Sequence, residues 1–241
     1  MTKTHHLNFL EHLDELRTKI IICLITLILL SIVAYFVSDP ITEWITRPIK
    51  NESSSVYFFS PHEAFWVKLK ISLLTGFIAS SPVIFMQVWL FITPGLYAHE
   101  KKVVLPVVII ATALFLCGIL FVYFIVLPVA LYFFLSFQSE TLRPLISIKE
   151  YIAFASSMLL SFGFIFNLPL LAAALTKLGI INHSFLIKQR RYMMVLIFII
   201  AALITPPDIF TQIMLAIPLI VLYEVCILIA WFLRKAQNKS E

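Results

Sequence analysis

The chain has 241 residues, of which 61% are hydrophobic and 13% are charged, and its formal net charge is +5. Soluble domains are about 45–50% apolar and about 25% charged, so this composition excludes an ordinary soluble protein and indicates an integral membrane protein. The Lys and Arg residues lie at the ends of apolar runs instead of forming a basic stripe or domain, which argues against nucleic acid as a partner.

Residues 1–19 precede the first apolar run. Acidic residues at Glu11, Asp14 and Glu15 interrupt what would be a basic leader, and no small-residue cleavage site follows, so we expect no cleaved signal peptide. Leucines recur here at near-helical spacing while Glu11 and Glu15, four apart, share a polar face, which predicts an amphipathic helix on the membrane surface. The plainer alternative is a solvated lead-in in which Glu15 pairs with Lys19.

Six apolar runs follow. A membrane-spanning helix needs about 20 apolar residues to cross a hydrocarbon core of about 30 Å. The fifth run reaches only about 20 Å. A run of this length is also compatible with a buried or re-entrant segment, but the run after it favours a short hairpin of two spans with local thinning of the bilayer. The predicted spans are residues 20–37, 67–92, 103–127, 151–178, 192–204 and 213–232.

The segments between the spans carry turn signals. Asp39-Pro40 ends the first span, and we expect the roughly thirty residues after it to form short helices and turns on the outer face. Pro94-Gly95 marks a short loop between the second and third spans, which holds Glu100 at the membrane surface. The basic sequence of residues 188–191 is predicted as a loop. Prolines in or at the ends of the second, third and fourth spans predict bent helices, since neighbouring groups must satisfy the freed carbonyls; they are Pro82, Pro106, Pro128 and Pro169.

Few polar side chains lie within the spans. Asn167 precedes Pro169 by two residues, and we weigh a bond to the backbone at a kink against a functional polar contact. Gln212 and Glu224 are the polar exceptions of the last span, and Glu224 is the only carboxylate well inside any span. The cysteines lie in apolar runs without Cys or His at metal-ligand spacing, so neither disulfides nor a metal nor any cofactor is expected; they are Cys23, Cys117 and Cys226.

The charges between the spans predict the orientation. Of the 18 Lys and Arg residues, six fall on the side of the first interspan segment and the other twelve fall on the side of both termini. Cytoplasmic segments carry the excess of Lys and Arg, so both termini are predicted to be cytoplasmic. The six on the outer side are Arg47, Lys50, Lys68, Lys70, Arg143 and Lys149.

Six sequence blocks, in order and at matching places in a six-span topology, resemble the TatC family, the multispanning subunit of the twin-arginine protein translocase. The resemblance covers nearly the whole chain. It implies an all-α membrane protein in a single polytopic domain, residues 1–241, with bent helices, an amphipathic N-terminal helix and short last two spans. The blocks are HLDELR (12–17), FFSPHE (58–63), SPVIFMQVWLFITPGLYAHEKK (81–102), YFIVLP (123–128), SFGFIFNLP (161–169) and TPPDIFTQ with AIPLIVLYE (205–212 and 216–224).

The resemblance implies a non-enzymatic receptor for folded cargo whose signal peptides carry paired arginines, placed in the inner membrane of a cell or, if the protein is organelle-encoded, in an organellar membrane. It also implies TatA-type and TatB-type single-span partners, a homo-oligomer within that complex, and transport driven by the proton-motive force. Glu15 and Glu100 match the family's signal-peptide-binding acids, and carboxylates suit this ligand because they pair bidentately with guanidinium groups. Leu13, Arg17, Pro94 and Tyr97 belong to the same motifs; Thr205, Asp208 and Gln212 match the partner-docking motif.

One position departs from the family, which usually has a glutamate where this chain has Asn167. The Asn167 amide can form hydrogen bonds at this position, but it cannot take up or release a proton as a glutamate would. The main alternative function is a secondary transporter for a small molecule, which would require matching interrupted helices in two halves. Asn167, Gln212 and Glu224 do not repeat between halves. A membrane-embedded enzyme would require a clustered nucleophile and base, and the spans carry none.

Overall fold

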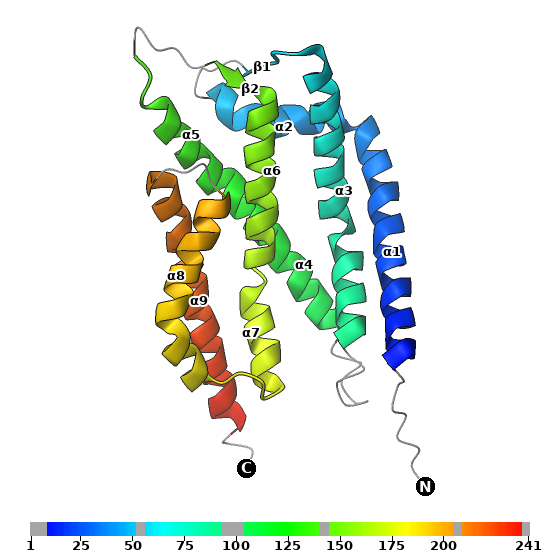
Figure 1. The fold of residues 1–241 in the computed structure, drawn as a ribbon, viewed down its shortest axis with the longest axis vertical. Helices are drawn as coiled ribbons and strands as arrows, with labels where there is room; N and C mark the ends of the chain where they lie inside the picture. Colours follow the sequence, from blue (N-terminus) through cyan, green and yellow to red (C-terminus); the bar gives the residue numbers. More distant parts are fainter. Residues whose placement is uncertain (1–8, 52–55, 93–103, 140–144, 205–208, 238–241) are drawn as a thin grey trace. The chain divides into compact units, whose positions relative to one another are not determined.

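The computed structural model describes residues 9–51, 56–92, 104–139, 145–204 and 209–237, and these residues are almost entirely helical (Figure 1). The chain divides into two compact units, Met1–Thr42 with Lys68–Thr112 and Glu43–Val67 with Ala113–Glu241. The elements are α1 (Phe9–Phe36), α2 (Ser38–Asn51), β1 (Val56–Tyr57), α3 (Pro61–Ile92), α4 (Val104–Phe121), the π-helical turn η3 (Val122–Val126), α5 (Leu127–Leu135), β2 (Ile146–Ser147), α6 (Ile148–Ile165), α7 (Leu168–Lys177), α8 (His183–Ile204) and α9 (Ile209–Gln237).

Among the residues that the structure describes, five helical stretches are long and apolar enough to cross a membrane: Leu13–Phe36, Pro61–Phe91, Val104–Leu135, Ile148–Lys177 and Ile209–Lys235. The additional apolar helix is α8, whose first turns carry three cations, Lys188, Arg190 and Arg191. The prediction of an all-helical, multispanning membrane protein is therefore confirmed.

In the first unit α1 and the later part of α3 run side by side (Figure 1). They approach closely at Gly76, where an added Cβ would lie 2.6 Å from the Cα of Ser31. Small residues of this kind let membrane helices meet backbone to backbone. At one end of the pair the Lys68 ammonium lies 2.6 Å from the Asp39 carboxylate. Most of α1 remains exposed along its length.

In the second unit α7, α8 and α9 form a tightly packed group. Its centre is a cluster of buried residues: Leu186, Ile197, Ala216, Leu219, Tyr223, Ile227 and Ala230. The turn from α7 to α8 is set by Gly179, whose φ of 72° favours glycine. After Gly179, the Ile180 N–H donates to the Leu175 carbonyl at 3.0 Å, and this bond satisfies one of the last carbonyls of α7.

Prolines account for the irregular turns of the third and fourth spans. Pro128 follows η3, in which Leu127 N–H donates to the Val122 carbonyl five residues back. Pro169 lies in the first turn of α7, where its missing N–H costs nothing, and the chain breaks between α6 and α7 just before it. By contrast, Pro82 and Pro218 lie inside α3 and α9 without ending either helix.

Within the second unit, two tyrosine hydroxyls hold the part of α2 that follows Thr42. Pro48 lies inside α2 and has no N–H, so the Trp44 carbonyl, four residues earlier, loses its usual donor. Tyr123 donates its hydroxyl to that carbonyl at 2.8 Å, and its ring stacks on the Trp44 ring with centroids 3.8 Å apart. Tyr151 donates to the adjacent Ile45 carbonyl at 2.6 Å. The two-residue strands β1 and β2 pair in parallel beside this anchor, with Val56 opposite Ile146.

Three sequence predictions need correction. Residues 188–191, predicted as a loop, are helical, because no Gly or Pro separates them from the apolar run and α8 therefore begins at His183. The N-terminal stretch predicted as a surface helix continues without a break into the first span from Phe9. The third span does not end at residue 127 but continues through Pro128 to Leu135, since the π-helical turn accommodates the proline.

Replacing Gly76 with alanine tests the approach of α1 and α3. The new Cβ would lie 2.2 Å from Ser31 Oγ and 2.6 Å from Ser31 N. Helix propensity alone favours alanine by roughly 0.5–1 kcal/mol, yet we expect a net loss of about 1–3 kcal/mol from overpacking. The loss should appear as a lower melting temperature of the purified protein in detergent. An unchanged or higher melting temperature would show that the helices do not meet there.

Candidate functional site

Glu15 lies on the second turn of α1 and is held by a cation one turn later. Lys19 Nζ is 2.5 Å from Glu15 Oε1, and the same ammonium lies 5.5 Å from the centroid of the Phe91 ring on α3. The Lys19 side chain is only 13% exposed, whereas that of Glu15 is 35% exposed. The pairing expected from the plainer interpretation of the sequence is therefore present, and it leaves the carboxylate accessible at the end of the α1–α3 pair.

The other residues predicted for signal-peptide binding divide into two groups. Leu13 and Arg17 are exposed on α1, on either side of Glu15. Glu100, Pro94 and Tyr97 lie outside the described residues. The structure thus supplies the environment of one of the two predicted carboxylates.

Of the predicted partner-docking residues, Gln212 lies in the first turn of α9. Gln212 is half-buried, and its Nε2 donates to the Phe198 carbonyl on α8 at 3.0 Å. It also lines an apolar groove of about 430 Å³ formed by Val195, Phe198, Ile199, Ala202 and Leu203. Thr205 and Asp208 lie outside the described residues. Gln212 therefore bridges the hairpin while facing a groove on its surface.

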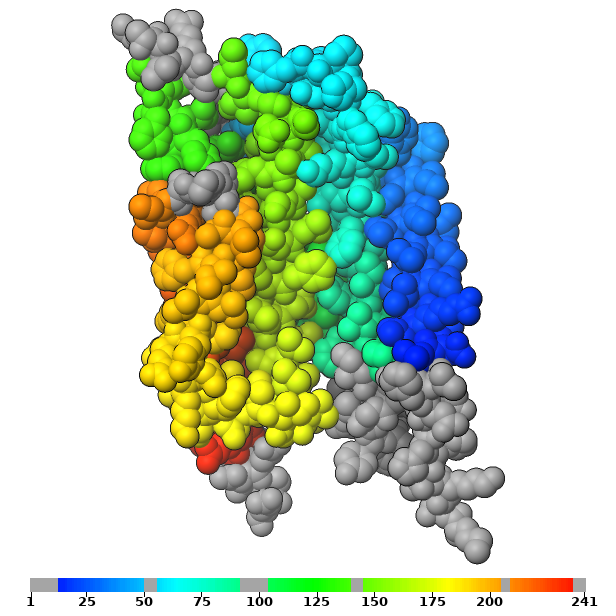
Figure 2. Space-filling model, viewed as in Figure 1, coloured from blue at the N-terminus to red at the C-terminus, as the bar shows by residue number. Residues whose placement is uncertain are grey.

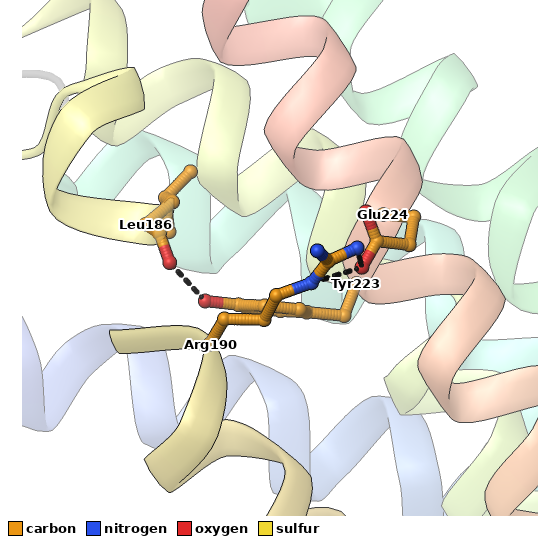
Figure 3. Close-up of polar contacts among 4 residues, drawn as sticks. All are labelled: Leu186, Arg190, Tyr223 and Glu224. Carbon is orange, nitrogen blue, oxygen red and sulfur yellow. Dashed lines mark hydrogen bonds and ion pairs between the residues drawn. The ribbon is translucent and has the colours of Figure 1, made fainter. Parts of the chain in front are cut away.

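Glu224 pairs with an arginine on the neighbouring helix. Arg190 Nε donates to Glu224 Oε1 at 2.8 Å, and its Nη2 donates to the same oxygen. Beside this pair, Tyr223 donates its hydroxyl to the Leu186 carbonyl at 2.7 Å (Figure 3). The two contacts join α8 to α9 within one helical turn. The negative charge of Glu224 is thus balanced by Arg190, although the sequence places Glu224 inside an apolar run.

Asn167 occupies the break between α6 and α7. Its backbone N–H donates to the Phe164 carbonyl at 3.0 Å, so the Gly163 carbonyl, four residues back, receives no bond from it. The side-chain Nδ2 donates to Gly163 at 3.0 Å instead. The Oδ1 atom is buried and accepts no hydrogen bond from the described residues. The structure therefore shows the bond from Asn167 to the backbone at the kink, which was one of the two roles considered for it. The Oδ1 atom remains as an acceptor without a donor among the described residues.

No group of three or more His, Cys, Asp or Glu side chains that could hold a metal ion occurs among residues 9–51, 56–92, 104–139, 145–204 and 209–237. The polar contacts that do occur are ion pairs and bonds to backbone carbonyls. They can position helices and present carboxylates.

Sequence reasoning missed Arg190 as a partner, because it assigned residues 188–191 to a loop. It also missed the hydroxyl anchors Tyr123, Tyr151 and Tyr223, each of which reaches a backbone carbonyl on another element. The sequence signal for Arg190 was Glu224, the carboxylate inside the last span, because a carboxylate in an apolar run calls for a cation at the same depth in the membrane. Identifying that cation required the register of α8 against α9.

Comparison with known proteins places these features in a family. Residues 11–218 match the family model described as Sec-independent protein translocase protein (TatC). The Sec-independent protein translocase protein TatC of Desulforapulum autotrophicum is 44% identical over 236 residues, which cover 97% of this chain and 87% of that protein. The protein of the same name from Carboxydothermus hydrogenoformans is 40% identical over 232 residues, 96% of each chain.

A solved structure is similar over the same range. The crystal structure of a twin-arginine translocase receptor, TatC, superposes with a TM-score of 0.85 at 39% sequence identity. The match covers 92% of this chain and 99% of that one.

A double-mutant cycle tests the link between α8 and α9. Arg190→Gln, Glu224→Gln and the double variant should show a coupling free energy of about 1 kcal/mol, the upper end for exposed pairs, because the two side chains are 53% and 35% exposed. Thermal or chemical unfolding in detergent measures it. Lys188→Gln combined with Glu224→Gln is the matched control and should show no coupling. Additive losses for Arg190 and Glu224 would contradict the pair.

Proposed function

Because this chain belongs to the TatC family of multi-pass membrane translocase proteins, we propose that it is the receptor subunit of a twin-arginine translocase. It binds signal peptides with paired arginines through Glu15 and Glu100 and organises transport of folded cargo. The observation that carries the proposal is the match to a twin-arginine translocase receptor over 92% of the chain at 39% identity. The receptor binds and positions its cargo and is not an enzyme.

The surroundings of Glu15 suit an arginine ligand. A carboxylate accepts hydrogen bonds at two oxygens, and a guanidinium fork matches that geometry better than an ammonium does. Lys19 already contacts Oε1, so an arriving guanidinium shares the carboxylate with Lys19 or displaces it. The exposed apolar side chains further along α1, such as Ile20 and Leu24, suit the apolar segment that follows the arginines.

The α8–α9 hairpin is the proposed contact for the single-span partners of the TatA and TatB type. Leu203 and Ile209, on either side of the turn, are 81% and 76% exposed, and Gln212 lies beside them. Gln212 gives one N–H to Phe198, so the rest of its amide can bond a partner helix, which is favourable in lipid. Thr205 and Asp208 belong to this proposed edge.

The proposal extends to orientation and energy source. Both termini lie in the cytoplasm of a cell whose inner membrane holds the protein, as the excess of cations on their side favours. Several copies assemble with the single-span partners, and the proton-motive force drives transport. Asn167 cannot carry a proton at its position, so any protonation step uses another group.

Charge changes at the two acids test the binding site. Glu15→Gln and Glu100→Gln should each weaken binding of a twin-arginine signal peptide about tenfold or more, because each removes a charge-assisted hydrogen bond of roughly 1.5–3 kcal/mol. Glu15→Lys and Glu100→Lys should weaken it further by adding repulsion. Dissociation constants are measured with labelled peptide and purified receptor in detergent.

Asp14→Lys is the matched control, since Asp14 is the exposed neighbour of Glu15 and the charge change is the same. It should leave the dissociation constant close to that of the wild type. Replacing both peptide arginines with lysine should also weaken binding. An unchanged dissociation constant for the Glu15→Lys, Glu100→Lys double variant would remove these residues from the site.

Site-specific crosslinking tests the docking edge. A photoreactive residue at Leu203 or Met214 should capture a single-span protein in native membranes, because Leu203 lines the groove with Gln212 and Met214 lies in the first turns of α9. Leu105, which is 65% exposed on α4, is the control position and should capture none. Capture of only lipid or further copies of this chain at Leu203 and Met214 would refute a docking edge for a different protein.

A further inference from the structure

The outer face of α8 carries two cations on one line. Residues three and four apart share a helix face, so Ser184, Lys188 and Arg191 lie on one stripe. Leu186, Ile197 and Ala201 lie on the opposite, buried face. All three stripe residues are exposed, and Figure 2 shows part of α8, coloured yellow to orange, at the surface. The cations of the stripe therefore point away from the packed interior of the unit.

A third cation joins the stripe at its start. Arg234, near the end of α9, approaches Ser184, with Nη1 3.4 Å from Ser184 Oγ. Lys188 has no ion-pair partner among the described residues, and Arg191 bonds the hydroxyl of its neighbour Tyr192 at 2.8 Å. Glu224, the one carboxylate among the described residues from 151 onward, is engaged by Arg190. The stripe consequently has a local excess of positive charge.

The same stripe continues into an apolar groove. Val195, Ile199 and Ala202 follow Arg191 at the same helical spacing, and all three line the groove of about 430 Å³. The rise from Arg191 to Ile199 is about 12 Å at 1.5 Å per residue. Along this one face of α8, the surface therefore changes from cationic residues to an apolar groove.

We propose that this stripe binds an acidic phospholipid. The phosphate lies against Lys188 and Arg191, with Arg234 adding to the attraction, and one acyl chain lies along Val195 and Ile199 in the groove. An anionic headgroup joined to a hydrocarbon chain matches both parts of the surface in the order in which they occur. The Tyr192 ring, exposed at the boundary, is typical of the headgroup level.

Other occupants match only one part. A free phosphate would use the cations and leave the groove empty, and an acidic soluble peptide would not enter an apolar groove at membrane depth. The inference does not depend on partner docking. A helix that docks beside Gln212 would displace the end of the acyl chain, and the lipid occupies the groove when no partner is present.

The test uses the full-length chain, purified without partners and placed in vesicles of phosphatidylcholine and phosphatidylglycerol in equal parts. The probe is phosphatidylglycerol with a photoreactive group on one acyl chain, and phosphatidylcholine with the same chain is the reference. We expect the phosphatidylglycerol probe to label residues 195–203 several-fold more strongly than the reference. Lys188→Gln with Arg191→Gln should lower the labelling by the phosphatidylglycerol probe several-fold, to the level of the reference, because these cations supply the preference for an anionic headgroup.

The double variant Lys70→Gln, Lys149→Gln is the matched control, since both lysines are exposed elsewhere and the charge change is equal. It should label like the wild type. Ala202→Phe, which fills the groove and keeps the cations, should lower the labelling of residues 195–203.

Three outcomes would overturn the proposal: equal labelling by the two probes, no loss in the Lys188, Arg191 variant, or displacement by glycerol 3-phosphate or an acidic peptide at the concentration of the lipid. Equal labelling by the two probes would indicate a nonselective lipid surface. Displacement by glycerol 3-phosphate would indicate a site for free anions, and displacement by the peptide would indicate a protein-docking surface.

Discussion

The structure depends on one constraint, which is that backbone carbonyls removed from water must find donors inside the protein. Prolines make this demanding, because each one removes an N–H from a helix. At Pro48 the missing donor is replaced by the Tyr123 hydroxyl, whose ring also stacks on Trp44. The substitute donor comes from η3, so the bond that satisfies the α2 carbonyl also fixes the position of α2 against a second element. Local defects of the backbone thereby become long-range connections of the fold.

The same solution recurs at the residues that carry function in our proposal. Gln212 supplies an N–H to the Phe198 carbonyl across the hairpin, and Asn167 supplies one to Gly163 within its own broken helix. Each amide has further hydrogen-bonding capacity after its structural bond is made. In Asn167 the remaining acceptor is buried, whereas Gln212 lines a groove open to the surface. The two amides look alike in the sequence, but only Gln212 can present its remaining capacity to a partner.

The sequence predicts what depends on hydropathy and misses what depends on register. Apolar runs and prolines locate the spans and their irregular turns, because burial in lipid and loss of an N–H are local properties. The pairing of Arg190 with Glu224 was not predictable in this way, since it requires knowing that α8 begins at His183 and how it aligns with α9. Glu15 was identified by its motif, but its contact with Lys19 above Phe91 involves a second helix far along the chain. Glu100, Pro94, Tyr97, Thr205 and Asp208 lie outside the described residues, so those predictions stay predictions.

The ion pair between α8 and α9 also bears on how the chain enters the membrane during synthesis. Lys188 and Arg191 point outward on α8, whereas Arg190 pairs with Glu224 on α9, which is made 34 residues after Arg190. Until α9 has left the ribosome, the first turns of α8 carry an uncompensated charge at the membrane. We therefore expect the last two helices to insert as one unit, and a nascent chain that stops before Glu224 to leave α8 outside the bilayer.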